Sequence, residues 1–320
     1  MNIRPFAEGD YQRMADIVGA IDAHRYRPAE WYRQRDESRN ASMLGLRLVA
    51  ERDGTLVGWG DIGNSWWAFH PRKFNMRLNV DPAVQGQGIG SLLFSELIQH
   101  AESDWSALRI NSETRENRPE SARFLEQRGF LLEHWRVEGH LQVSSARLER
   151  LPDCEQRLAS AGMRVATIAD FVDLRGHDVF SHELFELELA AQRDEPDYDP
   201  EGAMQFDQFV ANELEPSTLI DTGSFVALAG SELVGVSRLS RDLRLPGLLH
   251  VGFTGVHPDY RGRGIAMALK LRTVAYARAE GFEEIRTQND IENAPMLHIN
   301  EALGFTREPA WLMYAKTYST

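Results

Sequence analysis

The chain alternates strand-like apolar runs with segments of helical periodicity. In its second half, Leu248–Val256 is a largely apolar run of strand length, and Met267–Ala279 places apolar residues at intervals of three and four. Gly281 follows that helix where a glycine commonly ends one. Ser224–Ala229 and Leu233–Leu239 flank a short turn and predict a hairpin. This alternation predicts an α/β fold with a mixed sheet.

The remaining segments extend the same order of elements. In the second half we expect strands at Arg164–Thr167, Glu284–Gln288 and Trp311–Lys316, and helices at Phe180–Gln192, Met204–Leu214 and Ala294–Leu303. The first half follows the same order, with helices at Ser91–Ala101 and Pro119–Arg128. The chain is therefore expected to contain one arrangement of strands and helices twice.

Two glycine-rich segments, 176 residues apart, indicate that the repeat is a duplication. Val80–Gly90 and Val256–Ala266 have matching patterns, and each connects a predicted strand to a predicted helix. Asn117 and Asn293 match at the same spacing of 176 residues. The duplication predicts three segments: a domain at 1–150, a linker at 151–162 and a domain at 163–320.

A strand, a glycine-rich turn and a helix together form a site for an anion. The first turn of a helix leaves backbone N–H groups unpaired and carries about half a positive charge. Glycine lets the backbone approach a ligand closely, so both turns are candidate phosphate cradles; a plain tight turn is the alternative. The candidate binding residues are Val80, Gln85, Gly86, Gln87, Gly88, Ile89 and Gly90 in the first copy, and Val256, Arg261, Gly262, Arg263, Gly264, Ile265 and Ala266 in the second.

Charge is distributed unevenly along the chain, whose formal net charge is −13. Residues 1–150 contribute −1 and residues 151–320 contribute −12. Residues 178–221 hold thirteen carboxylates and one cation, Arg193. Nucleic-acid backbones are bound by clustered Lys and Arg, so no nucleic-acid partner is expected. The acidic segment is either a solvated face or part of a site for a cation.

The cysteine count and the absence of long apolar runs narrow the class of protein. Cys154 is the single cysteine, which excludes an intrachain disulfide and a cysteine-rich zinc site, and no metal is expected. No apolar segment follows Met1, and no apolar run of about eighteen residues occurs. We therefore expect a cytoplasmic protein without a membrane partner. The oligomeric state is left open.

The turns and the segments that follow them resemble a known superfamily. The pattern Arg/Gln-x-x-Gly-x-Gly/Ala begins at Gln85 in the first copy and at Arg261 in the second. An asparagine, a helix and a Gly-Phe ending follow downstream, as from Asn293 to Phe305. This resembles the GNAT superfamily of acyl-CoA-dependent N-acyltransferases, in tandem over nearly the whole chain. The resemblance implies two tandem domains, each a mixed, splayed β-sheet flanked by helices, and acetyl-CoA as the acetyl donor.

The resemblance also implies how the second turn would be used. The pyrophosphate of acetyl-CoA would lie on the turn, and the pantetheine arm would run beside Thr254–Val256, in the gap between two splayed strands. A backbone N–H near Val256 would stabilise the negative charge that develops on the acetyl oxygen. Asn293 would hydrogen-bond the arm; the alternative is that it caps the helix that starts at Ala294.

The catalytic side chains depart from the superfamily pattern. Many members carry a glutamate on the strand before the turn, but His250 is the only titratable residue of that strand here. Histidine suits proton transfer near neutral pH, and a structural role is the alternative. Many members also place a tyrosine five residues before the Gly-Phe phenylalanine, where Asn300 stands in the second copy and Leu125 in the first. His250 and Asn300 are the candidate catalytic positions, although an amide cannot replace a tyrosine as an acid.

The second copy is the candidate active copy, because Arg261 and Arg263 add charge to its turn and the acidic segment belongs to it. In this superfamily the segment between the first two strands lines the acceptor cleft, so its carboxylates favour a small molecule with a cationic primary amine. Glu183, Glu186 and Asp207 are the candidate acceptor contacts; solvated helix positions are the alternative. Two other functions stay open: a CoA-binding sensor or scaffold, and a tandem acyltransferase with a different acceptor.

Overall fold

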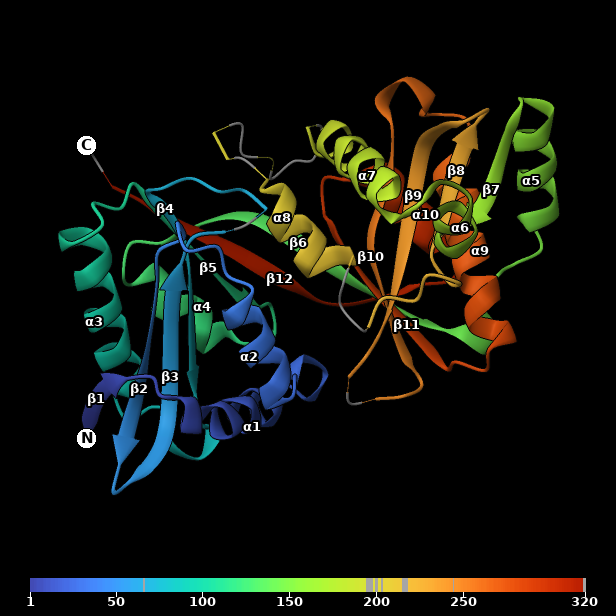
Figure 1. Ribbon diagram of the computed structural model, residues 1–320. Helices are drawn as coiled ribbons and strands as arrows, with labels where there is room; N and C mark the ends of the chain where they lie inside the picture. Colours follow the sequence, from blue (N-terminus) through green and yellow to red (C-terminus); the bar gives the residue numbers. More distant parts are fainter. Residues whose placement is uncertain are drawn as a thin grey trace.

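The computed structural model describes residues 1–65, 67–193, 198, 201–202, 204–214, 218–243 and 245–318. These residues form a continuous 12-stranded β-sheet with helices on both faces (Figure 1). The predicted α/β class, with a tandem arrangement of two splayed half-sheets, is confirmed.

The N-terminal half supplies the strands at one side of the sheet. They are β1 (Asn2–Pro5), β2 (Gly45–Arg52), β3 (Thr55–Gly63), β4 (Lys73–Val80), β5 (Arg109–Arg115) and β6 (Leu131–Gln142). The α-helices are α1 (Tyr11–Ile21), α2 (Ala29–Glu37), α3 (Ile89–Ser103) and α4 (Pro119–Glu126). Short 3-10 turns are η1 (Glu8–Asp10), η2 (Ala23–Arg25), η3 (Pro82–Val84) and η4 (Val143–Ser145).

The C-terminal half repeats this order. Its strands are β7 (Met163–Thr167), β8 (Phe225–Ala229), β9 (Glu232–Arg241), β10 (Leu248–Val256), β11 (Glu284–Asp290) and β12 (Thr306–Thr317). Its helices are α5 (Leu151–Ser160), α6 (Ile168–Arg175), α7 (His177–Gln192), α8 (Phe206–Phe209), the π-helix η5 (Val210–Leu214), the 3-10 turn η6 (Pro258–Tyr260), α9 (Ile265–Ala279) and α10 (Ala294–Leu303).

The two halves exchange their last strands. The order across the sheet is β1-β2-β3-β4-β5-β12-β6-β11-β10-β9-β8-β7. β12 pairs antiparallel with β5 from Arg109 to Arg115, and β6 pairs antiparallel with β11 from Glu284 to Asp290. In Figure 1 the red β12 crosses into the N-terminal half. The last strand of each half therefore pairs with a strand of the other half.

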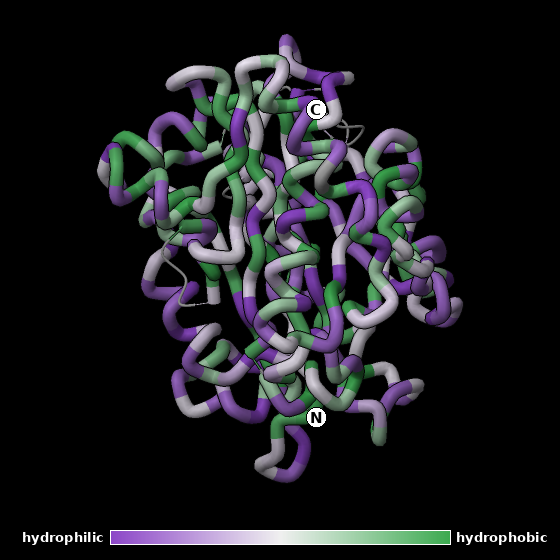
Figure 2. Tube along the Cα trace, turned by 90° about the vertical axis from the view of Figure 1, so that its right-hand side faces the viewer, coloured by the Kyte–Doolittle hydropathy of each residue, from purple (hydrophilic) through white to green (hydrophobic). Residues whose placement is uncertain are grey.

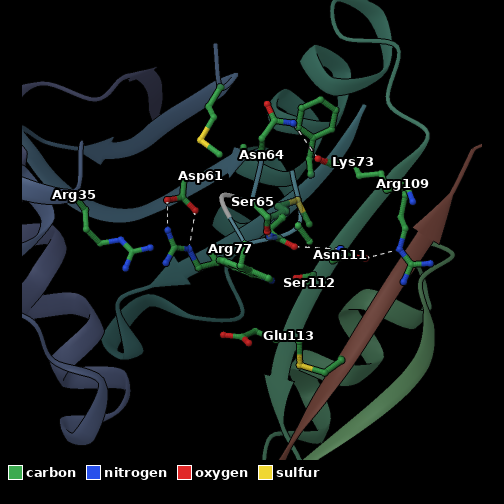
Figure 3. Close-up of a pocket in the computed structure, with 18 of the residues that line it drawn as sticks. Arg35, Asp61, Asn64, Ser65, Lys73, Arg77, Arg109, Asn111, Ser112 and Glu113 are labelled. Atoms are coloured by element: carbon green, nitrogen blue, oxygen red, sulfur yellow. Dashed lines mark hydrogen bonds and ion pairs between the residues drawn. The ribbon is translucent and has the colours of Figure 1, made fainter. Parts of the chain in front are cut away.

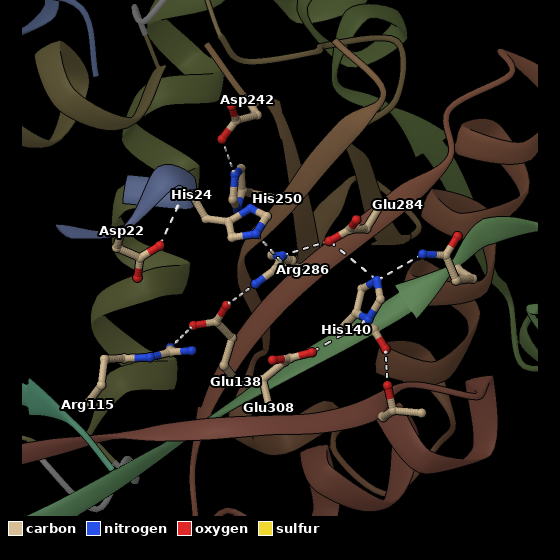
Figure 4. A network of polar contacts seen from close by, with 12 residues as sticks. Asp22, His24, Arg115, Glu138, His140, Asp242, His250, Glu284, Arg286 and Glu308 are labelled. Atoms are coloured by element: carbon tan, nitrogen blue, oxygen red, sulfur yellow. Dashed lines mark hydrogen bonds and ion pairs between the residues drawn. The ribbon is translucent and has the colours of Figure 1, made fainter. Parts of the chain in front are cut away.

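A buried carboxylate at the centre of the sheet joins the halves. Glu138 on β6 pairs with Arg115 on β5 and, at 2.7 Å, with Arg286 on β11 (Figure 4). It also accepts a hydrogen bond of 3.0 Å from Trp311 Nε1 on β12. Burial raises the pKa of a carboxyl, but these partners hold the pKa of Glu138 below its ordinary value. Four strands from both halves meet at this one charge, which favours a single register for the exchange.

In each half, two neighbouring parallel strands pair at their first residues and then separate. Within the described chain, β4 pairs with β5 from Lys73 to Met76, and β10 pairs with β11 from Leu248 to His250. The later residues of β4 and β10 stay paired on their other side, with β3 and β9. One edge of each strand therefore faces a gap in the sheet.

Helices cover both faces of the sheet. α3 packs on β2, β3 and β4, and α9 packs on β8, β9 and β10. The other face is covered by α1 in the N-terminal half and by α6 and α7 in the C-terminal half. Figure 2 shows hydrophobic and hydrophilic segments alternating along the chain through these layers. Among the described helices, none combines the length and apolar character that a membrane span requires.

The segment 151–162, expected to be a linker, contains helix α5. Cys154 and Leu158 on this helix are buried in the same apolar cluster as Leu269 of α9. Cys154 Sγ lies 3.3 Å from Arg157 Nη2. The single cysteine is therefore a packed side chain of this apolar cluster.

Candidate active site

The two glycine-rich turns have the same backbone conformation. Gly86 and Gly262 have φ of 76° and 74°, and Gly88 and Gly264 have φ of 82° and 83°, values that other residues rarely adopt. Gly88 and Gly264 are the N-caps of α3 and α9. A Cβ on any of these four glycines would meet no protein atom within 4 Å. Both turns are therefore open cradles at a helix N-terminus, and a phosphate group fits them.

The first residue of each turn holds the turn against the preceding strand. Gln85 Nε2 donates to the carbonyl of Val80 at 2.9 Å, and Arg261 Nε donates to the carbonyl of Val256 at 3.2 Å. Arg261 also donates from Nη2 to the carbonyl of Ala191, in the last turn of α7, at 3.2 Å. The contact to the strand is thus common to the copies, and the second copy adds a charge.

Both turns have a further arginine nearby, but it comes from different elements. Arg263 Nη2 donates to the carbonyl of Asp259 at 2.9 Å, and its guanidinium lies 4.9 Å from the ring centroid of Tyr260. Gln87 stands in the position of Arg263 in the first copy and accepts a hydrogen bond of 2.9 Å from Arg52 Nη1, on β2. The second turn therefore carries its own cations, whereas the first receives one from the sheet.

The first residues of α3 and α9 anchor the turns to the sheet. Ile89 and Ile265 are each 1% exposed. They lie over Gly58 and Gly235, where a Cβ would come within 3.2 Å and 2.9 Å of their Cγ2 atoms. The two isoleucines therefore belong to the packing under each cradle rather than to its open surface.

A cavity of about 750 Å³, the central cavity, lies between the halves. Thr254 from β10 and Asn289 from β11 line it on one side, and Leu78 and Asn79 from β4 line it on the other. Both gaps in the sheet therefore border this cavity. Its size suits a small-molecule site, and the free edge of β10 is available to a ligand with amide groups.

His250 lies where β10 leaves β11 and borders the central cavity. Its Nε2 lies 2.9 Å from Oδ2 of Asp242, a residue that is 7% exposed (Figure 4). Asp242 Oδ1 accepts a hydrogen bond of 2.9 Å from the N–H of Leu245. Because a carboxylate only accepts hydrogen bonds, Nε2 carries the proton and Nδ1 keeps its lone pair. This pair has the geometry of an oriented general base.

A β-bulge distinguishes the strand of His250 from its counterpart. The pairing of β10 with β9 shifts register within the splayed part of β10, whereas β4 pairs with β3 without a shift. β10 therefore has one residue more than β4 before the turn. His250 pairs with Arg286 where Asn75 pairs with Asn111. Asn75 hydrogen-bonds Ser65 Oγ and cannot serve as a base.

A loop of the N-terminal half reaches the same end of the central cavity. His24 Nε2 lies 3.3 Å from Arg286 Nη2, and Arg27 Nη1 lies 3.6 Å from Asp242 Oδ2. His24 Nδ1 is buried and has no hydrogen-bond partner among the residues that the structure describes. The candidate active site therefore contains side chains from both halves (Figure 4).

The two predicted asparagines have defined partners. Asn293 borders the central cavity, and its Oδ1 accepts a hydrogen bond of 3.3 Å from the N–H of Met296, so it caps α10. Asn300 is 6% exposed, and its Nδ2 donates to Asn289 Oδ1 at 2.7 Å. Asn300 therefore orients a residue that lines the central cavity and does not line the cavity itself.

The predicted acceptor contacts lie away from the central cavity. Glu183 pairs with Arg175 at 2.6 Å, while Glu186 and Asp207 are exposed, and none of these three carboxylates lines the cavity. The partner of Glu201, from the same segment, is Lys73 of the N-terminal half at 2.6 Å. Five other carboxylates of the segment lie outside the described residues: Asp194, Glu195, Asp197, Asp199 and Glu215.

Two carboxylates of that segment do line the central cavity. Glu188 and Glu213 pair with Arg238, at 3.1 Å and 2.9 Å. Both charges are therefore compensated within the protein. The acidity of the segment does not by itself define the charge of the acceptor.

Comparison with known proteins assigns the chain to a family. The model of the acetyltransferase (GNAT) family matches residues 12–130 and 182–305, once in each half. The chain belongs to the GNAT family. It is accordingly an acyl-CoA-dependent N-acyltransferase, and acetyl-CoA is the donor that the family uses. Within the described residues, no group of His, Cys, Asp or Glu is arranged to hold a metal ion.

Several known proteins are similar to this chain. A mycothiol acetyltransferase of Saccharomonospora viridis is 28% identical over 251 residues, which cover 75% of this chain and 73% of the relative. One of Thermobispora bispora is 27% identical over 124 residues, or 38% of this chain and 42% of the relative. A tandem GNAT protein from the clavulanic acid biosynthesis pathway has the same fold, with a TM-score of 0.74 and 17% identity over 100% of this chain and 99% of its own. A GCN5-related N-acetyltransferase from Sphaerobacter thermophilus has a TM-score of 0.68 and 19% identity over 99% and 95% of the two chains.

Three residues of this GNAT site were missed from the sequence: Asp242, His24 and Arg27. Asp242 follows β9 and His250 lies on β10, and the register of this hairpin was a signal that could have brought them together. His24 and Arg27 gave no such signal, because they reach the site from the other half of the chain.

Proposed function

We propose that this protein transfers the acetyl group of acetyl-CoA to a primary amine of a small molecule, in the C-terminal copy. One observation carries the proposal. An open cradle at Gly264, a free strand edge and an oriented His250–Asp242 pair follow one another along β10 and the turn after it. The first copy has the cradle and the edge, but Asn75 in place of the base.

The residues present fit the cosubstrate. Backbone N–H groups at the start of α9, with Arg261 and Arg263, would hold its phosphates. The free edge of Thr254–Val256 would hydrogen-bond the amides of its pantetheine arm. When bound, acetyl-CoA supplies the acetyl group as a thioester that an amine can attack.

His250 would supply the proton transfer that the amine requires. A primary amine of lysine type has a pKa of about 10.4, so it enters the site protonated and must lose a proton to act as a nucleophile. His250 Nδ1 would accept that proton, and Asp242 would hold the ring and stabilise the imidazolium. As the N–C bond forms and the C–S bond breaks, N–H groups of the splayed part of β10 would stabilise the charge on the acetyl oxygen. The departing thiolate would take the second proton that the attacking nitrogen loses as the amide forms, so coenzyme A would leave as its thiol, and the His250 imidazolium would return its proton to water.

The acceptor is proposed to be a small molecule. A central cavity bordered by both halves, with His24 and Arg27 beside the base, supports this class. The names of the curated relatives, mycothiol acetyltransferases, agree with it. The cationic acceptor expected from the acidic segment has less support, because Glu188 and Glu213 are already paired with Arg238.

Calorimetric titration of acetyl-CoA tests the proposal, with Gly264→Asp and Gly88→Asp as a matched pair of variants. Each places a negative side chain in a cradle of the same backbone conformation. We expect Gly264→Asp to abolish binding at the catalytic copy and, with it, release of CoA in the presence of an amine panel. Gly88→Asp should leave that release intact. No saturable binding in any sample would reject the proposal.

A further inference from the structure

A second cavity, of about 540 Å³, lies over β4 and β5 of the N-terminal half and beside α2 (Figure 3). We call it the N-terminal cavity. Its lining is rich in charge, and cations predominate. The lining cations are Arg35, Arg39, Arg47, Lys73, Arg77, Arg109 and Arg136, and the lining carboxylates are Asp36, Asp61, Glu113 and Glu133.

Most of these cations are already paired. The ion pairs of these cations are Arg47–Asp36, Arg77–Asp61, Arg109–Glu133 and Lys73–Glu201, and the remaining carboxylate, Glu113, pairs with Arg25. Arg77 binds Asp61 through two hydrogen bonds, of 3.0 Å and 2.7 Å. Burial raises the pKa of a carboxyl, yet Arg77 and its neighbours hold the pKa of Asp61 below its ordinary value. The carboxylates of the cavity are therefore committed to particular arginines.

Of the three remaining cations, Arg136 has an interaction of its own, and the guanidinium groups of Arg35 and Arg39 are left over. Arg35 and Arg39 have no ion-pair partner within the part of the chain that the structure describes. Arg35 lies 5.0 Å from the ring centroid of Trp31 and points from α2 toward the Arg77–Asp61 pair (Figure 3). The side chain of Arg35 is exposed, but crowding by the protein around it and repulsion by Arg77 lower its pKa to about 10. A negative group in the cavity would relieve this repulsion.

Two glycines leave space in the sheet for the Arg39 guanidinium. Gly45 and Gly63 face each other in the register of β2 and β3. A Cβ on Gly45 would overlap the Arg39 guanidinium, and a Cβ on Gly63 would come within 2.7 Å of Arg39 Nη2. The paired glycines thus leave a slot that the guanidinium fills, and they hold this cation at the cavity wall.

We propose that the N-terminal cavity binds a carboxylate or phosphate group between Arg35, Arg39 and Arg77, and that this group belongs to the acetyl acceptor. The second statement rests on the proposed function. Arg35 and Arg77 line the central cavity as well, so the two cavities adjoin there. A ligand held by these arginines can therefore extend toward His250. The N-terminal copy then recognises the acceptor, while the C-terminal copy carries out the transfer.

This arrangement changes the expected class of acceptor. An amine alone would gain nothing from two unpaired guanidinium groups, whereas a molecule with an amine and an acidic group matches both ends of the joined cavities. Two described carboxylates of the acidic segment come near this region, and both are paired. Glu201 pairs with Lys73, and Glu213, whose charge acts on Arg35, pairs with Arg238. The acceptor is accordingly an amino acid, an aminophosphate or a similar zwitterion.

A binding experiment tests the site itself. Inorganic phosphate and succinate are titrated calorimetrically into the full chain, with coenzyme A present in excess to fill the turns. The variant is Arg35→Gln, and the control is Arg33→Gln, on the same helix but outside both cavities. We expect saturable binding of at least one anion that weakens about tenfold or more in Arg35→Gln and persists in Arg33→Gln. Binding that is absent, or unchanged in Arg35→Gln, overturns the site.

A kinetic experiment tests whether the occupant is the acceptor. CoA release is compared for two matched pairs of amines: lysine with cadaverine, and phosphoethanolamine with ethanolamine. In one of the pairs, we expect the amine that carries the carboxylate or phosphate group to have a KM about tenfold lower or more than its partner. Arg35→Gln should remove this difference without changing the KM for acetyl-CoA. The pair that responds distinguishes carboxylate from phosphate. Equal KM values within both pairs overturn this part. If no amine causes CoA release, the proposed function is rejected, and so is the proposal that the occupant is the acceptor. The binding experiment tests the anion site independently of that result.

Discussion

The two copies share a backbone and differ in chemistry. Gly88 and Gly264 have nearly the same φ, and β4 and β10 both leave a parallel neighbour after a few residues. At corresponding positions, however, the first copy has Asn75 and the second has His250 with a buried carboxylate partner. The backbone of the two turns therefore does not distinguish the copies, and the side chain at the point where the strands separate does.

The packing of the two copies differs as well. Phe94 on α3 packs against Phe130, with ring centroids 6.2 Å apart. Lys270 stands 176 residues further on, and its Nζ lies 5.4 Å from the ring centroid of Phe305. Lys270 is 1% exposed, and its Nζ has no hydrogen-bond partner among the described residues. The second copy thus contains a buried cation where the first has an aromatic ring.

Separating the two halves should have the largest effect. A chain cut between Ala161 and Gly162 leaves β5 without β12 and β11 without β6 in the isolated fragments. We expect neither fragment to unfold cooperatively as a soluble monomer, because each exposes unpaired strand edges. Circular dichroism and size-exclusion chromatography measure this, and co-expression of both fragments is the control. A monomeric fragment 1–161 with a two-state transition would contradict the exchange.

Replacing His250 by asparagine, the residue at the corresponding position of the first copy, should reduce turnover. His250→Asn is expected to lower kcat by about 10²- to 10⁴-fold, because general base catalysis typically contributes that much. The affinity for acetyl-CoA should stay the same, since the cradle lies at the other end of β10. His100→Asn is the control, because His100 forms an exposed pair with Asp104, at 2.7 Å, on α3. An unchanged kcat in His250→Asn would assign the proton transfer to another group.

Replacing Lys270 by phenylalanine, the residue that Phe94 provides at the matching position of the first copy, should stabilise the protein. Burial lowers the pKa of Lys270 to about 7, so the unfolded state binds the proton more tightly. The loss of folding free energy that this buried amine causes is largest below pH 7, and it decreases as the pH rises toward the pKa of the unfolded state, near 10.5. We expect Lys270→Phe to raise the free energy of unfolding by about 4 kcal/mol near pH 7 and by roughly half of that at pH 9.

Denaturant titrations of Lys270→Phe and the wild type at pH 7 and pH 9 measure this difference. Lys270→Met is the second variant, since it removes the amine and keeps a flexible chain in the same buried position. A gain in stability that is the same at both pH values would show that the effect comes from packing and not from the buried amine.

Exchanging the first residue of the turns should have the smallest effect. Arg261→Gln copies Gln85, which makes the equivalent hydrogen bond to its strand. The turn should keep its conformation and lose one charge near the phosphates. We expect the Kd for acetyl-CoA to rise about three- to tenfold, with kcat unchanged. Isothermal calorimetry measures the Kd, and a change of less than twofold would place Arg261 outside the binding surface.

Local patterns in the sequence predicted a large part of the fold. The hairpin around Gly230, the strand Leu248–Val256 and the helix ending before Gly281 all appear in the structure near the expected bounds. Glycine spacing located both turns, because a positive φ is a property of one residue and its neighbours. The expected helix 204–214 is instead the short α8 followed by a π-helix.

Contacts between distant residues could not be predicted in this way. The exchange of β6 and β12 rests on pairings between strands more than a hundred residues apart, and no local period records such a choice. The distribution of charge along the sequence shows thirteen carboxylates in one segment, but only the fold shows that Glu201 meets Lys73 of the other half. The charge of a site is a sum over the elements that meet there.

The sequence by itself determined the duplication, the two cradles and the family, since each depends on residues that are adjacent or regularly spaced. Only the tertiary structure shows that His250, the candidate base, has a buried carboxylate partner, because Asp242 and His24 reach His250 and its neighbour Arg286 through strand pairing and the packing of one half on the other. It also decided that, among the residues that the structure describes, Arg35 and Arg39 have no ion-pair partner. Backbone conformation is set by local sequence, whereas the meeting of side chains depends on which distant segments pair.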